Sequence, residues 1–148
     1  MGRKKKERVF VYGTLLKGMF NHGRMNGARY CGKGRTMEKY YMTAGTVPYV
    51  NSDPQIAEDK IKGELYEVGP GQLRHIDIME GHPTFYERRL CAVEMEYGWT
   101  EIVWMYFNDN HFGENYIEDG DYRAYAEPHL EHLMHYREHV QRRAINPA

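Results

Sequence analysis

The sequence predicts an α+β fold, a small mixed β-barrel of about five to seven strands with a short internal helix and a C-terminal helix. Three observations lead to this expectation. Strand-like apolar runs separated by turn residues recur as far as Phe107. Only two segments have helical spacing, and they do not alternate with strands as in a doubly wound sheet. No internal repeat or low-complexity segment interrupts the chain.

Length, charge and cysteine content restrict the class of protein. The chain of 148 residues is most simply one domain, and its net charge of -1 gives no global reason to expect nucleic acid or a membrane as partner. A basic cluster at residues 3–8 is expected to be a solvated tail, the alternative being an anchoring or RNA-contacting arm. Two cysteines form no disulfide framework, and no run reaches membrane-spanning length. We therefore expect a cytoplasmic protein.

The first half of the chain predicts short strands separated by loops. Val9–Val11 has the β-branched and aromatic residues of a buried strand, and Gly13 then permits a sharp turn with free N–H groups. The segments that follow are a loop with at most one helical turn (17–24), two short strands or one bulged strand (28–44), an edge or loop piece around Pro48 (46–50), a mobile surface loop (51–59), and a strand weakened or bulged at Gly63 (60–68).

The second half predicts a helix, a hairpin and a terminal helix. Residues 72–79 have helical spacing, and Gly81 suits a left-handed helix end. Residues 85–97 and 100–107 form a hairpin around Gly98-Trp99, and residues 108–122 form a loop. Pro128 opens an amphipathic last helix.

Glu80 is the candidate catalytic residue. Leu73, Ile76 and Glu80 are spaced i, i+3 and i+7, which puts the carboxylate on the face of two core aliphatic side chains. An inward carboxylate should have a raised pKa or a ligand partner, as a general base near neutral pH requires. The alternative is a helix end that turns outward, with Glu80 paired to Arg88 or Arg89 at the surface.

Four separated motifs make the pattern specific. They are Val9-Phe10-Val11-Tyr12-Gly13-Thr14-Leu15, Gly18 with Asn21-His22, Gly63-Glu64-Leu65-Tyr66, and Ile76-Asp77-Ile78-Met79-Glu80-Gly81-His82-Pro83 followed by Tyr86-Glu87-Arg88. In this order they resemble the γ-glutamylcyclotransferase-like superfamily, above all its γ-glutamylamine cyclotransferase and AIG2-like branch. Residues 117–122 are similar to the piece that closes the family core, so the resemblance covers about residues 8–122. Ile76, where the family has leucine, is a mild departure.

The resemblance implies a compact barrel with a cavity at one end and a cofactor-independent enzyme. The turn Tyr12, Gly13, Thr14 and Leu15 would hold a γ-glutamyl substrate through backbone groups. Glu80 would deprotonate its α-amino group, which attacks the γ-carbonyl and releases 5-oxoproline with a free amine or amino acid. No Ser or Cys triad is needed for this chemistry, because the substrate supplies the nucleophile.

Three further residues are weaker candidates for substrate binding. Tyr86 matches the family tyrosine and is expected to line the pocket or orient Glu80, although a packed core tyrosine is an equal alternative. Asn21, with His22, would close the pocket mouth, unless the pair only caps a loop. Tyr122 would also reach the cavity.

No metal site is expected. The C-terminal histidines, His129, His132, His135 and His139, have spacings that could bind zinc on one helical face, but a solvated face or a dimer contact explains them better. Cys31 and Cys91 are expected to be buried in strands.

The organisation we expect is a basic tail (1–7), a γ-glutamylcyclotransferase-like domain (8–125) and a C-terminal helical extension packed on it (126–148). The protein would be a monomer or homodimer whose partner is a small γ-glutamyl substrate. The rival hypothesis is a non-catalytic module on the same barrel that binds a small carboxylate or amine. A related role, removal of a γ-glutamyl protecting group in a biosynthetic pathway, would use the same residues.

Overall fold

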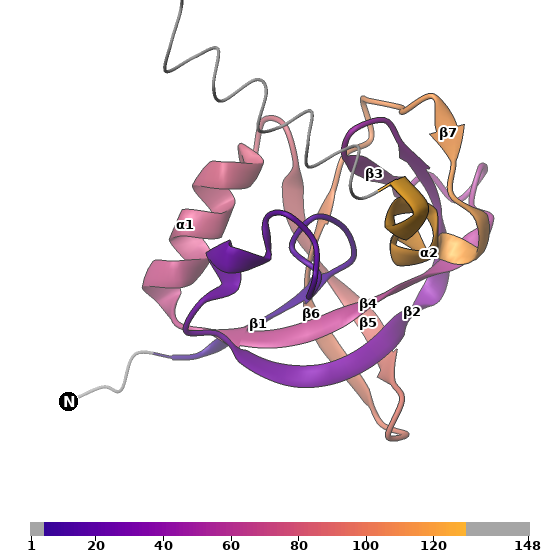
Figure 1. The fold of residues 1–148 in the computed structure, drawn as a ribbon. Coiled ribbons are helices and arrows are strands. Elements are labelled where there is room, and N and C mark those ends of the chain that lie inside the picture. Colours follow the sequence, from indigo (N-terminus) through magenta and orange to yellow (C-terminus); the bar gives the residue numbers. More distant parts are fainter. Residues whose placement is uncertain (1–4, 130–148) are drawn as a thin grey trace, which may run out of the picture.

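The computed structural model describes residues 5–129. Its strands are β1 (Glu7–Val11), β2 (Arg29–Ala44), β3 (Pro48–Asn51), β4 (Asp59–Val68), β5 (Glu87–Met95), β6 (Thr100–Phe107) and β7 (Asn115–Tyr116). Its helices are α1 (Pro70–Glu80) and α2 (Tyr122–Ala126), with short 3-10 turns at His22–Met25, Glu118–Gly120 and Glu127–His129. Figure 1 shows the curved strands in the middle of the molecule, with α1 at one side and α2 at the other.

Five strands close into a mixed barrel in the order β2-β4-β1-β6-β5, because β2 pairs with both β4 and β5. The pairing of β1 with β6 is parallel, and the other pairings around the barrel are antiparallel. β3 and β7 add to β2 outside this ring. The predicted fold class is therefore confirmed, and Pro48 begins an edge strand as expected.

The segment predicted as two short strands or one bulged strand, residues 28–44, contains one bulged strand, β2. The register of β2 against β4 shifts between Tyr30 and Gly32 and again between Arg35 and Lys39. Bulges bend a strand and increase its twist, which allows one 16-residue strand to reach two neighbours. The local sequence left the choice between one strand and two open, and barrel closure decides it.

The strand at residues 60–68 was predicted to be weakened or bulged at Gly63, and the bulge is wrong. Gly63 pairs with Gly34 in a regular stretch of the β2–β4 ladder. A Cβ atom at position 63 would lie 2.3 Å from the Val11 carbonyl oxygen and 2.8 Å from the Phe10 ring. Glycine is needed here because the neighbouring strand passes closely, which is the other common reason for glycine inside a strand.

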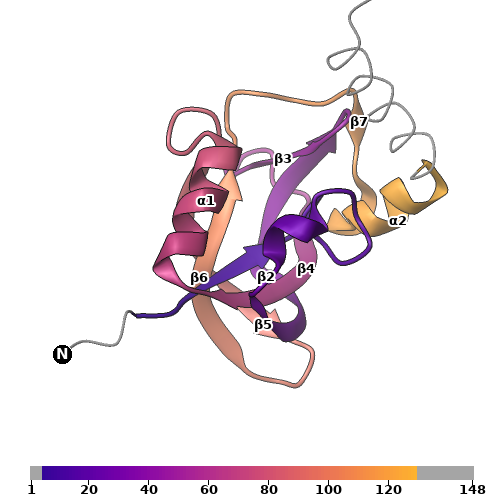
Figure 2. The same ribbon diagram turned by 60° about the vertical axis from the view of Figure 1, so that its left-hand side comes forward.

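The loop after β1 lies beside both helices. In Figures 1 and 2 the indigo segment that follows β1 lies between α1 and α2. It contains the single helical turn that was expected, at His22–Met25. The β5–β6 hairpin is confirmed, with eight residue pairs from Glu87↔Phe107 to Glu94↔Thr100.

The end of the described chain differs from the expectation. Residues 108–122 contain the short strand β7 and a 3-10 turn, and the helical turn α2 begins at Tyr122. The Asp121 carboxylate accepts a hydrogen bond from the Ala124 N–H, so a capping aspartate starts this helix. The predicted helix from Pro128 falls almost entirely outside the described residues, as do His132, His135 and His139.

The two cysteines differ in their environment. Cys91 is buried among core residues, as predicted, whereas Cys31 is only partly buried, and both are free thiols. Cys31 lies beside the bulge in β2, where the regular alternation of inward and outward side chains is interrupted. Across residues 5–129, no helix is both long enough and apolar enough to cross a membrane.

Candidate active site

A cavity of about 240 Å³ brings together most of the predicted site residues. Its lining comes from the end of β1 and the turn after it, from the start of β3, from the end of α1 and from β6. The lining residues are Phe10, Val11, Tyr12, Gly13, Thr14, Leu15, Asn21, Val47, Pro48, Met79, Glu80, Phe85, Tyr86 and Tyr106. Seven predicted site residues are in this set, so the turn and the end of α1 do face one space.

The turn after β1 presents backbone donors that have no partner. The Leu16 N–H bonds the Gly13 carbonyl at 3.0 Å and closes the turn. Within residues 5–129, no hydrogen bond is donated by the N–H groups of Gly13, Thr14 or Leu15. Free N–H groups on successive residues favour oxyanion or carboxylate binding.

Pro48 packs against this turn at close range. A Cβ atom at position 13 would lie 2.5 Å from the Cγ atom of the Pro48 ring. Glycine at position 13 therefore allows the edge strand β3 to approach the turn. This packing is why the turn stays at the wall of the cavity.

Glu80 ends helix α1 with its side chain half-buried in the cavity wall. The helix stops because Gly81 adopts left-handed backbone (φ 70°), and its N–H bonds the carbonyls of Asp77 and Ile78. Burial raises the pKa of Glu80 to about 7, and the charge of Arg24 opposes this rise only in part. No hydrogen bond or ion pair to the Glu80 carboxylate is formed by the described part of the chain.

The arginines that were the alternative partners of Glu80 are paired elsewhere. Arg88 donates from Nε and Nη2 to the two Asp77 oxygens at 2.9 and 3.1 Å. Arg89 pairs with Glu87 and Asp109. Asp77 lies about one helical turn before Glu80, and it forms the ion pair with Arg88 that was considered for Glu80. The surface-pairing alternative for Glu80 is therefore wrong.

Three tyrosines build the cavity wall, and each hydroxyl donates its proton to another group of the protein. Tyr12 donates to the Tyr106 carbonyl at 2.7 Å, and Tyr86 donates to the Pro48 carbonyl at 2.7 Å. Tyr106 donates to Asp77 Oδ1 at 2.6 Å. Burial raises the pKa of all three phenols, so each stays protonated at neutral pH.

Asn21 lines the cavity, and Tyr122 does not. The Asn21 amide donates to Thr14 Oγ1 at 3.0 Å, so it both caps the turn and faces the space. His22 bonds the Leu15 carbonyl through Nδ1 and acts as a loop cap. Tyr122 is 1% exposed, its hydroxyl has no partner among the described residues, and it lies outside the lining.

Sequence reasoning missed part of the lining. Tyr106, Phe85 and Val47 reach the cavity from positions outside the four motifs, and Met79 lies in a motif but was not predicted to line the cavity. Tyr106 lies in the run 100–107, for which the sequence predicted only a strand of the hairpin. The one usable signal was the tyrosine at the end of a strand, where an aromatic hydroxyl needs a buried partner.

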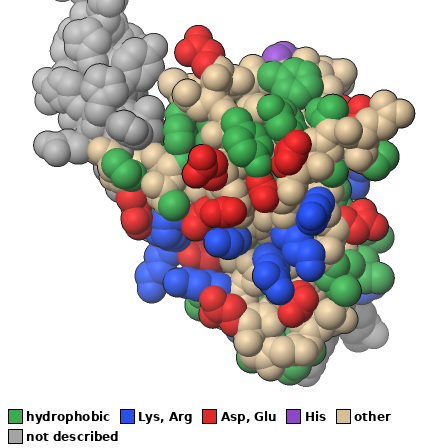
Figure 3. Space-filling view, turned by 90° about the vertical axis from the view of Figure 1, so that its right-hand side faces the viewer, with side chains coloured by type: hydrophobic (Ala, Val, Ile, Leu, Met, Phe, Trp, Pro, Cys, Tyr) green, Lys and Arg blue, Asp and Glu red, His purple; other side chains and the backbone are tan. Residues whose placement is uncertain are grey.

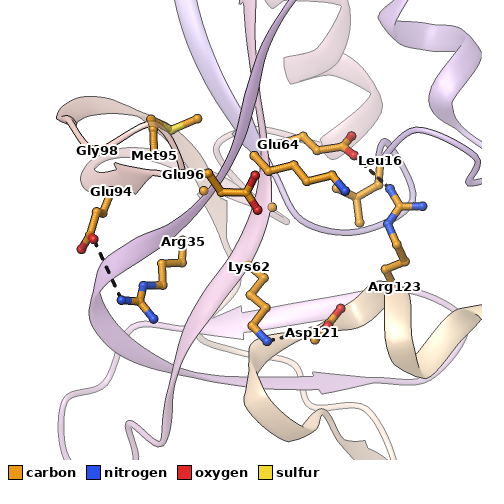
Figure 4. Close-up of a pocket in the computed structure, with 13 residues that line it drawn as sticks. Leu16, Arg35, Lys62, Glu64, Glu94, Met95, Glu96, Gly98, Asp121 and Arg123 are labelled. Carbon is orange, nitrogen blue, oxygen red and sulfur yellow. Dashed lines mark hydrogen bonds and ion pairs between the residues drawn. The ribbon is translucent and has the colours of Figure 1, made fainter.

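A second cavity of about 500 Å³ is a charged groove (Figure 4). In it Arg123 pairs with Glu64 at 2.9 Å, Lys62 with Asp121 at 3.9 Å and Arg35 with Glu94 at 4.0 Å. Figure 3 shows the same mixture of basic and acidic side chains over one face of the molecule. Because these charges balance one another, the smaller cavity with its unpaired carboxylate is the better candidate for chemistry.

Glu64 links this groove to the turn. Its side chain is buried, and Oε1 accepts from the Lys17 N–H at 2.9 Å and from the Tyr66 hydroxyl at 3.1 Å. Oε2 accepts from Arg123 at 2.9 Å. The Gly63-Glu64-Leu65-Tyr66 motif thus has a structural role, because it anchors the residue two positions after Leu15.

The residues present do not form a metal centre. Within residues 5–129, no three His, Cys, Asp or Glu side chains are grouped to hold an ion. Glu80 is the one carboxylate of the small cavity among its described lining residues. The arrangement suits proton transfer next to a set of backbone donors.

Comparison with known proteins identifies the family of this chain. The family model described as gamma-glutamyl cyclotransferase, AIG2-like, matches residues 9–124. A putative gamma-glutamylcyclotransferase of Methanocaldococcus jannaschii is 40% identical over 120 residues, covering 80% of this chain and 98% of that protein. The gamma-glutamylaminecyclotransferase of Homo sapiens is 35% identical over 95 residues, covering 59% of this chain and 61% of that protein.

Solved structures share the fold. The crystal structure of an uncharacterized protein of Pyrococcus horikoshii matches with a TM-score of 0.66 and 28% identity, covering 85% of this chain and 98% of that one. An AIG2-like protein of Mus musculus matches with a TM-score of 0.66 and 28% identity, covering 78% and 90%.

Proposed function

Since this chain belongs to the gamma-glutamyl cyclotransferase, AIG2-like family, we propose that it is a cofactor-independent γ-glutamylcyclotransferase with Glu80 as general base. One observation carries the proposal: an unpaired carboxylate and three unpaired backbone N–H groups line the same cavity. A binding module needs donors or charges for its ligand, but it has no use for a carboxylate whose pKa burial raises to about 7, which is the property that a general base requires.

The first step is a proton transfer. The Glu80 carboxylate takes a proton from the substrate α-ammonium group, and the neutral nitrogen then attacks the γ-carbonyl carbon. A carbon–nitrogen bond forms, and the γ-carbonyl becomes an oxyanion. A base whose pKa is close to the working pH is largely ionised and is still basic enough to accept a proton from the substrate. Such a group typically increases the rate by roughly 10²–10⁴-fold.

The second step breaks the original amide bond. The oxyanion collapses and the original carbon–nitrogen bond breaks as Glu80 returns its proton to the leaving amide nitrogen. The ring nitrogen still carries one extra proton, which the regenerated Glu80 carboxylate removes and passes to the departing amine. The products are 5-oxoproline and a free amine, and no water is consumed. Because the nucleophile and the carbonyl belong to one molecule, holding the γ-glutamyl chain folded supplies much of the acceleration.

The turn after β1 has the complementary role. N–H groups of Gly13, Thr14 and Leu15 would hold the oxygens of the γ-glutamyl group, including the oxygen on which charge develops. Tyr12, Tyr86 and Asn21 would shape the space around the folded substrate. Removing a single donor of this kind typically lowers a rate by about 10²–10³.

The experiment is a panel assay. The protein is incubated with γ-glutamyl amines and γ-glutamyl amino acids, and 5-oxoproline is measured, with Glu80→Gln run in parallel. Glu94→Gln is the matched control, because Glu94 is also partly buried but lines the other cavity. We expect release by the wild type and by Glu94→Gln, and a large loss in Glu80→Gln. Absence of 5-oxoproline from every compound would favour the binding module, and full activity of Glu80→Gln would exclude this base.

A further inference from the structure

We propose that His82 is a positioning residue for the site. As a neutral imidazole with its proton on Nε2, it holds the segment of residues 81–88, which carries Tyr86 next to Glu80. The proposal adds to the proposed function a residue that touches no substrate. Its effect on turnover rests on that function, whereas its hydrogen bond and its protonation state are measured without any turnover.

Segment 81–88 joins Glu80, the last residue of α1, to the first residues of β5. Tyr86 in this segment is buried in the cavity wall, and Phe85, with 40% of its surface accessible, lies at the cavity mouth. The Phe85 N–H donates to the Gly81 carbonyl at 2.8 Å. The Tyr86 N–H donates to the Glu80 carbonyl at 3.2 Å. A shift of this segment therefore moves Tyr86 relative to the base.

The His82 side chain fastens the far end of the segment. Its Nδ1 accepts a hydrogen bond from the Arg88 N–H at 3.0 Å. On the side of β5 away from β6, β2 pairs only with residues 93–95, so no strand of the described chain reaches Arg88 there. The imidazole therefore supplies the acceptor that a neighbouring strand would otherwise provide.

This hydrogen bond fixes the protonation state of the imidazole. An N–H group donates only to a lone pair, so Nδ1 of His82 carries no proton and the proton of the neutral ring is on Nε2. The imidazolium form has a proton on both nitrogens, and its Nδ1–H would face the Arg88 N–H with no acceptor between them. Protonation of His82 therefore breaks the bond and releases the end of the segment.

His22, in the loop after β1, has the opposite arrangement. Its Nδ1 lies 2.9 Å from the Leu15 carbonyl oxygen, which only accepts hydrogen bonds, so this nitrogen carries the proton. Protonation keeps that bond, because the second proton goes to Nε2. The two histidines therefore respond differently to acid, and His22 is the internal reference for the experiment.

The charged and titratable groups around His82 come from three elements. Asp77 of α1 and Arg88 of β5 form their two-point ion pair beside it, and its ring lies edge-on to Tyr106 of β6, with 6.5 Å between the centroids. The Asp77 carboxylate favours the charged ring, and the Arg88 guanidinium disfavours it. Because these two groups are paired with each other, their effects on His82 oppose one another. The hydrogen bond from the Arg88 N–H is the contact that only the neutral ring makes.

Nuclear magnetic resonance of the isotope-labelled protein tests the hydrogen bond. At pH 8 we expect the His82 ring to be the Nε2–H tautomer and the His22 ring to be the Nδ1–H tautomer. As acid protonates His82, protection of the Arg88 amide against hydrogen exchange should fall roughly threefold to tenfold, the effect of one lost hydrogen bond. A proton on His82 Nδ1 at pH 8, or Arg88 protection that does not follow the protonation of His82, would overturn the proposal.

Two substitutions separate the acceptor from the ring. His82→Asn places an amide oxygen close to the position of Nδ1, and this acceptor does not titrate. It should keep the Arg88 protection at pH 8 and at pH 5, whereas His82→Ala should lose it at both. His75→Ala is the matched control, because His75 is exposed on α1 and lies outside the cavity lining. Equal loss in His82→Asn and His82→Ala would mean that packing of the ring, and not its acceptor, holds the segment.

The activity of the same variants tests the consequence for the site. At pH 8, His82→Ala should raise KM for a γ-glutamyl substrate roughly threefold to tenfold, because a displaced wall holds the folded substrate less well. His82→Asn should retain most of the activity, and His75→Ala should match the wild type. Protonation of His82 lowers kcat/KM only by this fixed factor, which distinguishes it from the progressive fall expected when Glu80 is protonated.

Two results separate this proposal from the proposed function. Lost Arg88 protection with an unchanged KM in His82→Ala would show that His82 does not position the site. If no γ-glutamyl compound is turned over, the proposed function fails, while the resonance experiment still decides whether His82 holds the segment.

Discussion

Arg88 forms a two-point ion pair with Asp77, although Glu80 lies only three residues further along the same helix. The Tyr106 hydroxyl adds a third hydrogen bond to Asp77, and the Arg88 guanidinium lies 4.1 Å from the centre of the Trp104 ring. The pair ties α1 to the β5–β6 hairpin. It also occupies the cation that would otherwise be available to Glu80.

Asp77→Asn should weaken Glu80 as a base. The substitution frees Arg88 and removes a negative charge near Glu80, and both changes lower the pKa of Glu80. In a plot of kcat/KM against pH, the fall on the acid side (the acid limb) should move to lower pH. The value of kcat/KM at higher pH should drop roughly tenfold, because a weaker base accepts the proton less readily. Loss of hydrogen bonds to a charged group should also reduce the free energy of unfolding by about 1.5–3 kcal/mol.

The control for this variant is the double substitution Asp77→Asn with Arg88→Gln. It keeps the structural damage but removes the freed charge, so the acid limb should return toward its wild-type position. If Asp77→Asn leaves the acid limb in place, Asp77 has only a structural role.

Gly13→Ala should distort the turn and abolish most of the activity. The new Cβ atom would lie 2.5 Å from the Pro48 ring, so the turn or β3 must shift. Overpacking of this kind typically costs about 1–3 kcal/mol of stability. Gly23→Ala is the control, because a Cβ atom there meets nothing within 4 Å. Equal activity in the two variants would mean that the exact position of the turn is unimportant.

Glu64→Gln tests the anchor of the turn. The glutamine cannot pair with Arg123 as a carboxylate does, so the loop at Lys17 should loosen and KM for a γ-glutamyl substrate should rise, by roughly threefold to tenfold. The acid limb should stay in place, since Glu64 does not line the Glu80 cavity. Glu96→Gln in the same charged groove should leave KM unchanged. A shift of the acid limb in Glu64→Gln would contradict the assignment.

Glu80→Gln should be more stable than the wild type at high pH. Burial raises the folded-state pKa of Glu80 from 4.5 to about 7. The wild type therefore loses stability as the pH rises from 4.5 to about 7, and its stability stays at the lower level above pH 7. Relative to pH 4, the variant should therefore gain up to about 3.5 kcal/mol at pH 8, at about 1.4 kcal/mol for each unit of the pKa shift from 4.5 to about 7. Urea unfolding at both pH values measures it, and an equal difference at the two values would mean that Glu80 is not desolvated.

Local sequence patterns predicted most of the elements and half of the site. The strand before Gly13, the helix that ends at Gly81 and the hairpin around Gly98-Trp99 all have turn or cap residues with one dominant conformation. Glu80 lies seven residues after Leu73 and four after Ile76, and this spacing was enough to predict an inward carboxylate.

The remainder depends on contacts between distant segments. Whether residues 28–44 form one strand or two is decided by closure of the barrel through β2–β5 pairing. Glycine is required at position 63 because β1 passes close to it, and no local sequence pattern shows this approach. The pairing of Arg88 with Asp77 rather than Glu80, and the presence of Phe85 at the cavity mouth, likewise follow from tertiary packing.

The most direct test of Glu80 as the base is the pH dependence of kcat/KM for 5-oxoproline release between pH 4 and pH 9. Protonation of Glu80 removes the base, so kcat/KM should fall tenfold for each pH unit on the acid side, with a midpoint near 7. Any residual activity of Glu80→Gln should not show this fall of kcat/KM around pH 7. A midpoint near the ordinary glutamate value of 4.5, or a limb that persists in Glu80→Gln, would contradict the account.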